Sequence, residues 1–381
     1  MKQIIRFALT LYGLHPLSAT EQLPKVDFRN PIHQYDSAIP QDPFSKSLNG
    51  IINGEANLNF KSEKDYLLSL LNLFSISPHS QLLVFSTTSL QLSRISPSNP
   101  RAIYFSEDIY LGYVPGGQIE IIGIDPYLGA IPYIFNLPDK NSPAHPKVYR
   151  SRRCMNCHAS NDIGGIPGLL ISSVIPAPDG GTIDVFRKRS FGHAVPFDER
   201  FGGWLITGRH PFSNSWANSI GSMQGEHIKK ITNPPGEFFT WDKYLANSSE
   251  IVAHLILEHQ IGFTNLCISI SYKFREISLQ NSNFNDKEIK DFIETETQAL
   301  LSYILFKDEA PFPKNKIDRS SEYINNFQSG KNNINEVHSL KKLNLQSRLF
   351  ENRCSYMLFS NSFKGLPLQI KNHLISKLHF I

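Results

Sequence analysis

Hydrophobic residues change their spacing along this chain of 381 residues, and each change predicts a different kind of structure. Between residues 81 and 136 they form short runs of Ile, Val, Tyr and Phe, separated by turn residues such as Pro115-Gly116-Gly117. The runs predict five strands, at Gln81–Ser86, Arg101–Phe105, Ile109–Val114, Gln118–Ile124 and Ala130–Asn136. Because no helical pattern separates them, we expect one antiparallel sheet rather than a parallel one.

Helical spacing precedes this sheet and returns in the last third of the chain. Ser62 can cap a helix in which apolar residues recur between Tyr66 and Phe74, and Pro78 follows its end. Later patterns predict helices over residues 250–263, over residues 286–306 and from Pro367 onward. A polar loop is expected over residues 312–340. The patterns together predict an α+β fold, antiparallel and β-rich in its N-terminal and central part and helical in its C-terminal third.

Four regions follow from these patterns. Residues 1–20 combine the basic Lys2 and Arg6, an apolar run and the small residues Ser18-Ala19-Thr20, which is the pattern of a signal peptide. Residues 21–60 are rich in Pro, Asn and Asp and predict an extended leader. Residues 61–240 form the β-rich region, and residues 241–381 a helical region packed on it. The signal peptide predicts a periplasmic or otherwise exported protein.

Composition narrows the class of protein. A hydrophobic content of 40% and a charged content of 19% are globular values, and the net charge of +4 includes no basic stripe that predicts nucleic-acid binding. Four cysteines are too few for a disulfide scaffold, and whether Cys267 pairs with Cys354 is left open. The most apolar segment after the N-terminus, residues 251–270, contains His254 and Glu258. It therefore predicts a buried helix, and no transmembrane segment is expected beyond the signal peptide.

The most specific pattern is Cys154-Met155-Asn156-Cys157-His158. Two thiols three residues apart, followed directly by a histidine, are typical of covalent attachment of haem c. Each thiol can form a thioether with one vinyl group of the haem, and the imidazole of His158 can then bind the iron as proximal ligand. Strand patterns precede the motif and continue after it, at Leu169–Pro176, Thr182–Phe186 and Trp204–Gly208. The scaffold is therefore not that of a small all-α cytochrome c.

Two other interpretations of the cysteine pair remain. A structural zinc site needs four ligands, but Cys267 and Cys354 stand alone in the sequence. A redox-active dithiol usually begins a helix in a βαβ unit, whereas this motif lies between an Arg-rich and a Gly-rich segment. Both interpretations are weaker than haem c, with one haem per chain.

Several residues could complete a haem site. Arg153, directly before the motif, can reach a haem propionate, because guanidinium pairs with carboxylate in a bidentate geometry. For a second axial ligand we rank His193 first, then Met223, then His210. If that position is open, His193, His210 or Arg209 would supply acid–base chemistry.

His254 and Glu258 are four residues apart in a predicted helix, and His259 follows. Because a third metal ligand at matching spacing is missing, we interpret His254 and Glu258 as a buried pair rather than as a second metal site.

From residue 81 to the end, the chain resembles a family of exported bacterial mono-haem c-type cytochromes (cytochrome c domain-containing proteins). The resembling stretches are Leu83–Ser86, Ser96-Pro97, Arg101–Phe105, Arg153–His158, Gly202-Gly203-Trp204, Thr207-Gly208, Leu257–Gln260 and Cys354-Ser355-Tyr356. The resemblance implies export, covalent haem and electron transfer, and no assigned activity. The family pattern has a methionine shortly after the Gly-Gly-Trp strand, where this chain has Ser215-Trp216-Ala217-Asn218.

The function expected from the sequence is a periplasmic cytochrome that carries one haem c and transfers electrons to an unidentified redox partner protein. One alternative is a haem enzyme of peroxidase or oxidase type with an open distal position. The other is a structural protein with zinc at Cys154 and Cys157.

Overall fold

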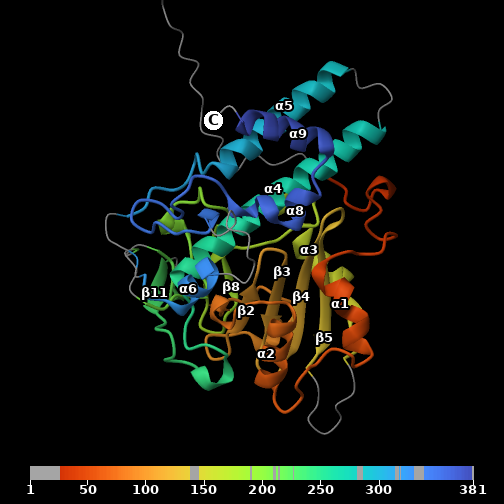
Figure 1. Ribbon diagram of the computed structural model, residues 1–381. Coiled ribbons are helices and arrows are strands. Elements are labelled where there is room, and N and C mark those ends of the chain that lie inside the picture. The colour runs from red at the N-terminus through yellow and green to blue at the C-terminus, as the bar shows by residue number, and fades with distance from the viewer. Residues whose placement is uncertain are drawn as a thin grey trace, which may run out of the picture.

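The computed structural model describes residues 26–137, 146–188, 191–208, 212, 215–225, 227–280, 286–313, 317, 319–329 and 339–379. The predicted signal peptide, Arg209 and His210 lie outside these residues. Figure 1 shows the sheet with the N-terminal helices in one part of the molecule and the long C-terminal helices stacked at the other end. The predicted α+β class is confirmed.

The described part of the chain forms a seven-stranded antiparallel sheet in the order β6-β5-β4-β3-β2-β1-β9. Its strands are β1 (Leu82–Val84), β2 (Arg101–Phe105), β3 (Ile109–Tyr113), β4 (Gln118–Asp125), β5 (Gly129–Asn136), β6 (Tyr149–Arg150) and β9 (Trp204–Leu205). The five predicted strands are β1 to β5, and β1 is shorter than expected. The predicted strand at Trp204–Gly208 is likewise reduced to β9.

Two short hairpins accompany the sheet in the same described residues. They pair β7 (Ser173–Pro176) with β8 (Thr182–Lys188), and β10 (Ser219–Gln224) with β11 (His227–Thr232). The first pair was predicted, although Leu169–Ser172 precedes β7 instead of extending it. The second pair was not predicted.

The two faces of the sheet have different partners. One face packs Tyr104, Leu111, Ile121 and similar side chains into a core with the helices α1 (Pro43–Ile52) and α2 (Glu63–Leu73). The other face contributes Phe105, Tyr110 and other side chains to a core with α4 (Ile251–Gln280). A sheet buried on both faces agrees with the continuous apolar runs in the sequence.

Helix α1 corrects the prediction that residues 21–60 form an extended leader. Asp42 caps it, because its Oδ1 accepts hydrogen bonds from the backbone amides of Phe44 (2.9 Å) and Ser45 (3.1 Å). Pro43 stands at the first helical position, where proline's fixed φ suits a helix. The proline that suggested a loop therefore marks a helix start. The predicted cap of α2 is confirmed, since Ser62 Oγ accepts from the amide of Asp65 at 3.1 Å.

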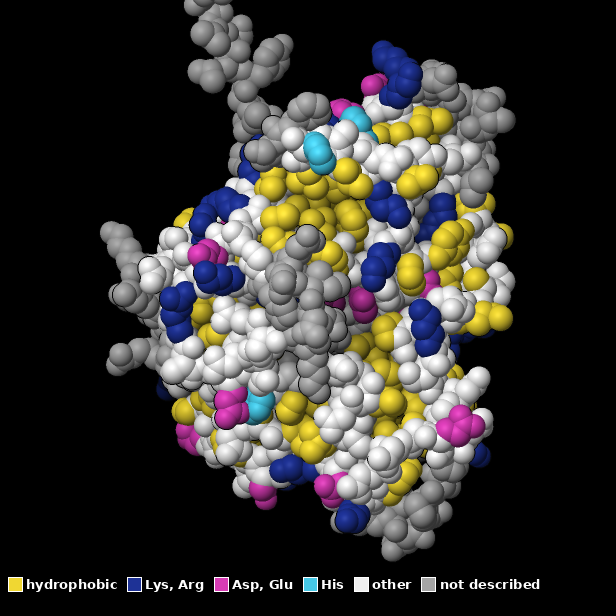
Figure 2. Space-filling model, in the orientation of Figure 1, with side chains coloured by type: hydrophobic (Ala, Val, Ile, Leu, Met, Phe, Trp, Pro, Cys, Tyr) yellow, Lys and Arg dark blue, Asp and Glu magenta, His cyan; other side chains and the backbone are white. Residues whose placement is uncertain are grey.

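The C-terminal third is helical as predicted. Its helices are α4, α5 (Asp286–Ile304), α6 (Glu322–Ser329), α8 (Asn361–Lys364) and α9 (Leu368–Leu378). Helix α4 is much longer than the predicted residues 250–263, and α6 lies in the stretch predicted as a polar loop. Figure 2 shows apolar side chains gathered over this helical end, where α9 exposes Leu368 and Ile375.

Within the described ranges, one helix has the length and composition to cross a membrane, Ile251–Ser278. Its most apolar window is 94% buried inside the fold. These apolar residues of α4 therefore belong to the protein core, as expected from the sequence.

The Asp42 carboxylate also joins α1 to the sheet, because Tyr133 on β5 donates its hydroxyl to Asp42 Oδ2 at 2.7 Å in a buried contact. We expect Asp42→Ala to lower the free energy of unfolding by about 2–4 kcal/mol, from the lost cap and the unpaired tyrosine hydroxyl. Urea denaturation measures the loss, with Ser62→Ala on α2 as a cap-only control. Equal losses in the two variants would contradict the linking role of Asp42.

Candidate functional site

The motif occupies a single compact turn. Residues Arg152–Cys154 form a 3-10 turn, and Met155–His158 continue it as the short helix α3. Cys157 is exposed and Cys154 partly buried, and both thiols are free. Burial raises the pKa of Cys154, while a hydrogen bond to Ser151 acts in the opposite direction. The turn thus presents two reduced thiols and one imidazole from five consecutive residues.

Strand β5 anchors this turn to the sheet. The backbone amide of Ser151 donates to the carbonyl of Pro132 at 2.9 Å. Met155 is buried, and its sulfur lies 3.3 Å from the hydroxyl of Tyr35, which also donates to the carbonyl of Ala130 at 2.8 Å. Met155, one of the two residues between the cysteines, therefore fixes the motif in the core.

The ring of His158 is held by one backbone carbonyl. Its Nδ1 lies 3.0 Å from the oxygen of Gly168, and the amide of Gly168 donates to the carbonyl of His158 at 2.8 Å. A carbonyl oxygen only accepts, so Nδ1 carries the proton and Nε2 has a free lone pair. Burial lowers the pKa of His158, which favours this neutral ring. Among the described residues, Nε2 has no hydrogen-bond partner.

Helix α4 fixes the segment that orients His158. Asn265 Oδ1 accepts from the amide of Leu169 at 2.8 Å, and its Nδ2 donates to the carbonyl of Leu169 at 2.7 Å. A Cβ atom at Gly168 would lie 2.5 Å from Asn265 Oδ1. Glycine is therefore required here, and a chain of contacts runs from Asn265 through Leu169 and Gly168 to the imidazole. Sequence reasoning did not identify Asn265.

The three arginines before the motif have different surroundings. Arg150 donates to the carbonyl of Tyr35 at 2.6 Å and lies over the Tyr35 ring. Arg152 lies 3.6 Å from Asp36 in an exposed pair. Arg153 is exposed, and no ion pair engages it among the residues that the structure describes. Of the three guanidinium groups, that of Arg153 is the one left for an added carboxylate such as a haem propionate.

The predicted second axial ligands lie elsewhere. His193 is buried, its Nδ1 is 2.9 Å from Nδ1 of His259, and its ring packs on Tyr303 at 4.1 Å. Met223 lies on β10 and is 58% exposed. Within the described part of the chain, no contact joins either residue to Cys154, Cys157 or His158. The assignment of a second axial ligand stays a prediction.

His193 belongs to a buried polar cluster around α4. Arg200 donates to the carbonyls of Val195 (2.7 Å) and His193 (2.9 Å), and its Nη1 lies 2.8 Å from Glu258 Oε2. Burial raises the pKa of Glu258 to about 7, while the positive charge of Arg200 lowers it. His259 Nε2 lies 2.7 Å from the hydroxyl oxygen of Ser355.

The predicted pairing of Glu258 with His254 is wrong, because Glu258 pairs with Arg200 instead. Both ring nitrogens of His254 lack hydrogen-bond partners among the described residues, and its ring packs edge-on against Trp204 at 4.6 Å. Burial lowers the pKa of His254 to about 3, so the ring is neutral in the folded protein.

The described residues around the motif do not supply the four ligands of a structural zinc site. In the described ranges, no group of three or more His, Cys, Asp or Glu side chains is placed to hold one metal ion. All four cysteines lie in those ranges and are unpaired, Cys267 and Cys354 included. A single imidazole with a free Nε2 beside two free thiols fits covalent haem better than a four-ligand zinc site.

Comparison with models of known protein families, with curated protein sequences and with solved structures finds no match for this chain. The function is therefore inferred from the motif and its geometry.

His254 generates a prediction about acid stability. The unfolded chain takes up a proton at this ring below about pH 6.5, whereas the folded protein does so only near pH 3, so acid favours unfolding in that window. Between pH 7.5 and pH 5, this single ring should remove about 2 kcal/mol of stability. Over the same pH interval, we expect the free energy of unfolding of His254→Leu to fall by about 2 kcal/mol less than that of the wild type. Urea denaturation at the two pH values measures both.

The exposed His379 gives a matched control, because its replacement by Leu removes a histidine without changing a buried site. An unchanged pH dependence in His254→Leu would show that the ring is protonated, or hydrated, in the folded state.

Proposed function

We propose that this protein is a c-type cytochrome that binds one haem through Cys154, Cys157 and His158 and transfers electrons in the periplasm. The observation that carries the proposal is the hydrogen bond from His158 Nδ1 to the carbonyl of Gly168. It leaves Nε2 as the available ligand nitrogen, on the same turn as two free thiols. A metal-bound histidine usually donates its other nitrogen in this way.

The bound haem would supply a one-electron iron couple, and the chain would hold it in place. Cys154 and Cys157 would each form a thioether with one vinyl group, which prevents loss of the cofactor outside the cytoplasm. His158 would bind the iron through Nε2, and the contacts of Gly168 with Asn265 and Leu169 would limit rotation of its ring. Arg153 would pair with a propionate.

Export is part of the proposal. The basic, apolar and small-residue pattern of residues 1–20 supports a signal peptide, and covalent haem attachment in bacteria occurs outside the cytoplasmic membrane. The resemblance to exported mono-haem cytochromes agrees with both. The proposed partner is a redox protein that accepts or supplies single electrons.

A second candidate function is a haem enzyme with an open distal position. It is favoured by the positions of the two candidate ligands. His193 lies 2.9 Å from His259, Met223 is exposed, and no contact among the described residues joins either one to the motif. Spin state separates the two functions. A six-coordinate, low-spin spectrum that does not change with cyanide or peroxide supports the carrier, and a high-spin spectrum that responds to both supports the enzyme.

We expect the protein, exported from a host with haem-attachment machinery, to be coloured and to have its mass increased by one haem. The variant Cys154→Ala/Cys157→Ala should lose the covalent haem, because neither thioether can form. Cys354→Ala, which removes a thiol elsewhere, is the matched control and should keep it. Intact mass and the visible spectrum measure both.

A colourless wild-type protein with bound zinc would replace the haem proposal with the zinc one. A colourless, metal-free protein would leave the thiol pair as a redox dithiol.

A further inference from the structure

A strip of the sheet beside the motif is only partly covered. Ile103 on β2 pairs with Gly112 on β3, Gly112 with Glu120 on β4, and Glu120 with Ile134 on β5. Side chains alternate between the two faces of a strand, so Ile122 shares the face of Glu120. These five residues, the open strip, lie on the face that α4 covers farther along, and their four side chains are partly exposed.

The motif lies at the end of this strip. The Ser151 amide bonds to the carbonyl of Pro132, which pairs with Ile122, and the Ala130 amide bonds to the carbonyl of Pro167, next to Gly168. Met155 points into the core of the opposite face, with Tyr35. The segment that holds His158 packs on the α4 side through Leu169.

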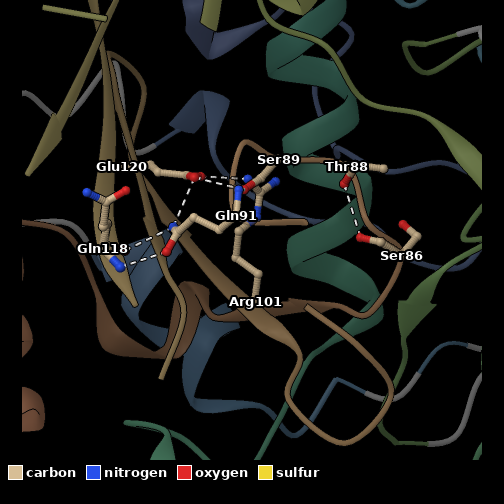
Figure 3. Close-up of polar contacts among 7 residues, drawn as sticks. All are labelled: Ser86, Thr88, Ser89, Gln91, Arg101, Gln118 and Glu120. Carbon is tan, nitrogen blue, oxygen red and sulfur yellow. Dashed lines mark hydrogen bonds and ion pairs between the residues drawn. The ribbon is translucent and has the colours of Figure 1, made fainter. Parts of the chain in front are cut away.

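A partly buried ion pair crosses the open strip. Arg101 Nη1 lies 2.7 Å from Glu120 Oε2, and the two side chains are 14% and 16% exposed. Ser89 and Gln91 donate to Glu120 Oε1 at 2.8 and 3.0 Å, so three side chains converge on one carboxylate (Figure 3). Burial raises the pKa of Glu120, but these partners hold it below its usual value, so the carboxylate is ionised at neutral pH.

The pair lies on the sheet face that adjoins the motif. Glu120 and Ile122 lie two residues apart on β4, and Ile122 pairs with Pro132, whose carbonyl accepts the Ser151 amide. Partly buried charges such as these are screened by salt much less than exposed ones.

We propose that the open strip is the surface on which the haem packs, and that the Arg101–Glu120 pair sets the reduction potential of the iron. This inference rests on the proposed function. Ile103, Ile122 and Ile134 offer an apolar surface to a flat macrocycle. Gly112 has no side chain and so leaves the centre of this surface flat, where a Cβ atom would lie 3.2 Å from Glu120 Oε2. Burial and nearby charge are among the means by which a protein tunes such a potential.

The charges of Arg101 and Glu120 predict the direction in which each variant shifts the reduction potential. Reduction adds one electron to the iron, so a nearby positive charge stabilises the reduced state and a nearby negative charge the oxidised state. Arg101→Gln leaves the negative Glu120 unbalanced and should lower the potential. Glu120→Gln leaves the positive Arg101 unbalanced and should raise it. Loss of packing alone would not give opposite signs.

Redox titration of the purified haem-loaded protein, followed by its visible spectrum, measures these shifts. The control is Lys273–Glu296, a pair of similar burial (10% and 14% exposed) whose nitrogen and oxygen lie 3.1 Å apart, between α4 and α5. Lys273→Gln and Glu296→Gln should leave the potential unchanged. The Arg101 and Glu120 variants each leave one partner of a partly buried pair unpaired, which can destabilise the fold. A second site therefore tests the effect of charge without breaking this pair.

Ile134 provides that site, because it is partly exposed and can accept a charge. Ile134→Lys should raise the potential and Ile134→Glu should lower it. Unchanged potentials in both Ile134 variants would overturn the inference, and so would shifts of the same sign in Arg101→Gln and Glu120→Gln. If the protein still contains covalent haem in that case, the proposed function stands. A wild-type protein without haem would instead refute the proposed function.

Discussion

The hydrogen bond between His158 Nδ1 and the carbonyl of Gly168 is the contact on which the site depends. It selects one tautomer and leaves Nε2 as the single ring nitrogen available to a metal. The bond holds because Asn265 on α4 fixes Leu169 with two hydrogen bonds and Gly168 fits against the Asn265 side chain. Helix α4, the longest helix among the described residues, thus orients the His158 ring through Asn265, which follows His158 by more than one hundred residues.

Helix α4 joins two different polar environments. Its residues Glu258 and His259 belong to a buried cluster with Arg200 and His193, and Asn265 holds the backbone of Leu169 beside the motif. The cluster satisfies most of its groups internally, as a buried polar network must if it is to stabilise a fold. The motif instead leaves thiols and an imidazole nitrogen free. This contrast between a closed network and an open set of donors is the reason that we place the function at the motif.

Sequence patterns predicted what depends on local spacing. Strands β1 to β5 follow from short apolar runs between turn residues, and the grouping of Cys154, Cys157 and His158 on one turn follows from their spacing in five adjacent residues. The predictions failed where a contact is distant in sequence. Asn265 lies 96 residues from Leu169, whose backbone it binds. Glu258 pairs with Arg200 rather than with its helical neighbour His254, because an ion pair stabilises a buried carboxylate better than a neutral ring does.

The protonation state of His158 in the haem-free protein is the most direct test of this account. Nitrogen-15 labelling of histidine distinguishes protonated from unprotonated ring nitrogens by their chemical shifts, and a His158→Gln variant assigns the signals. The account predicts a neutral ring at neutral pH, with the proton on Nδ1 and Nε2 bare. A ring protonated on Nε2, or a charged ring, would contradict it.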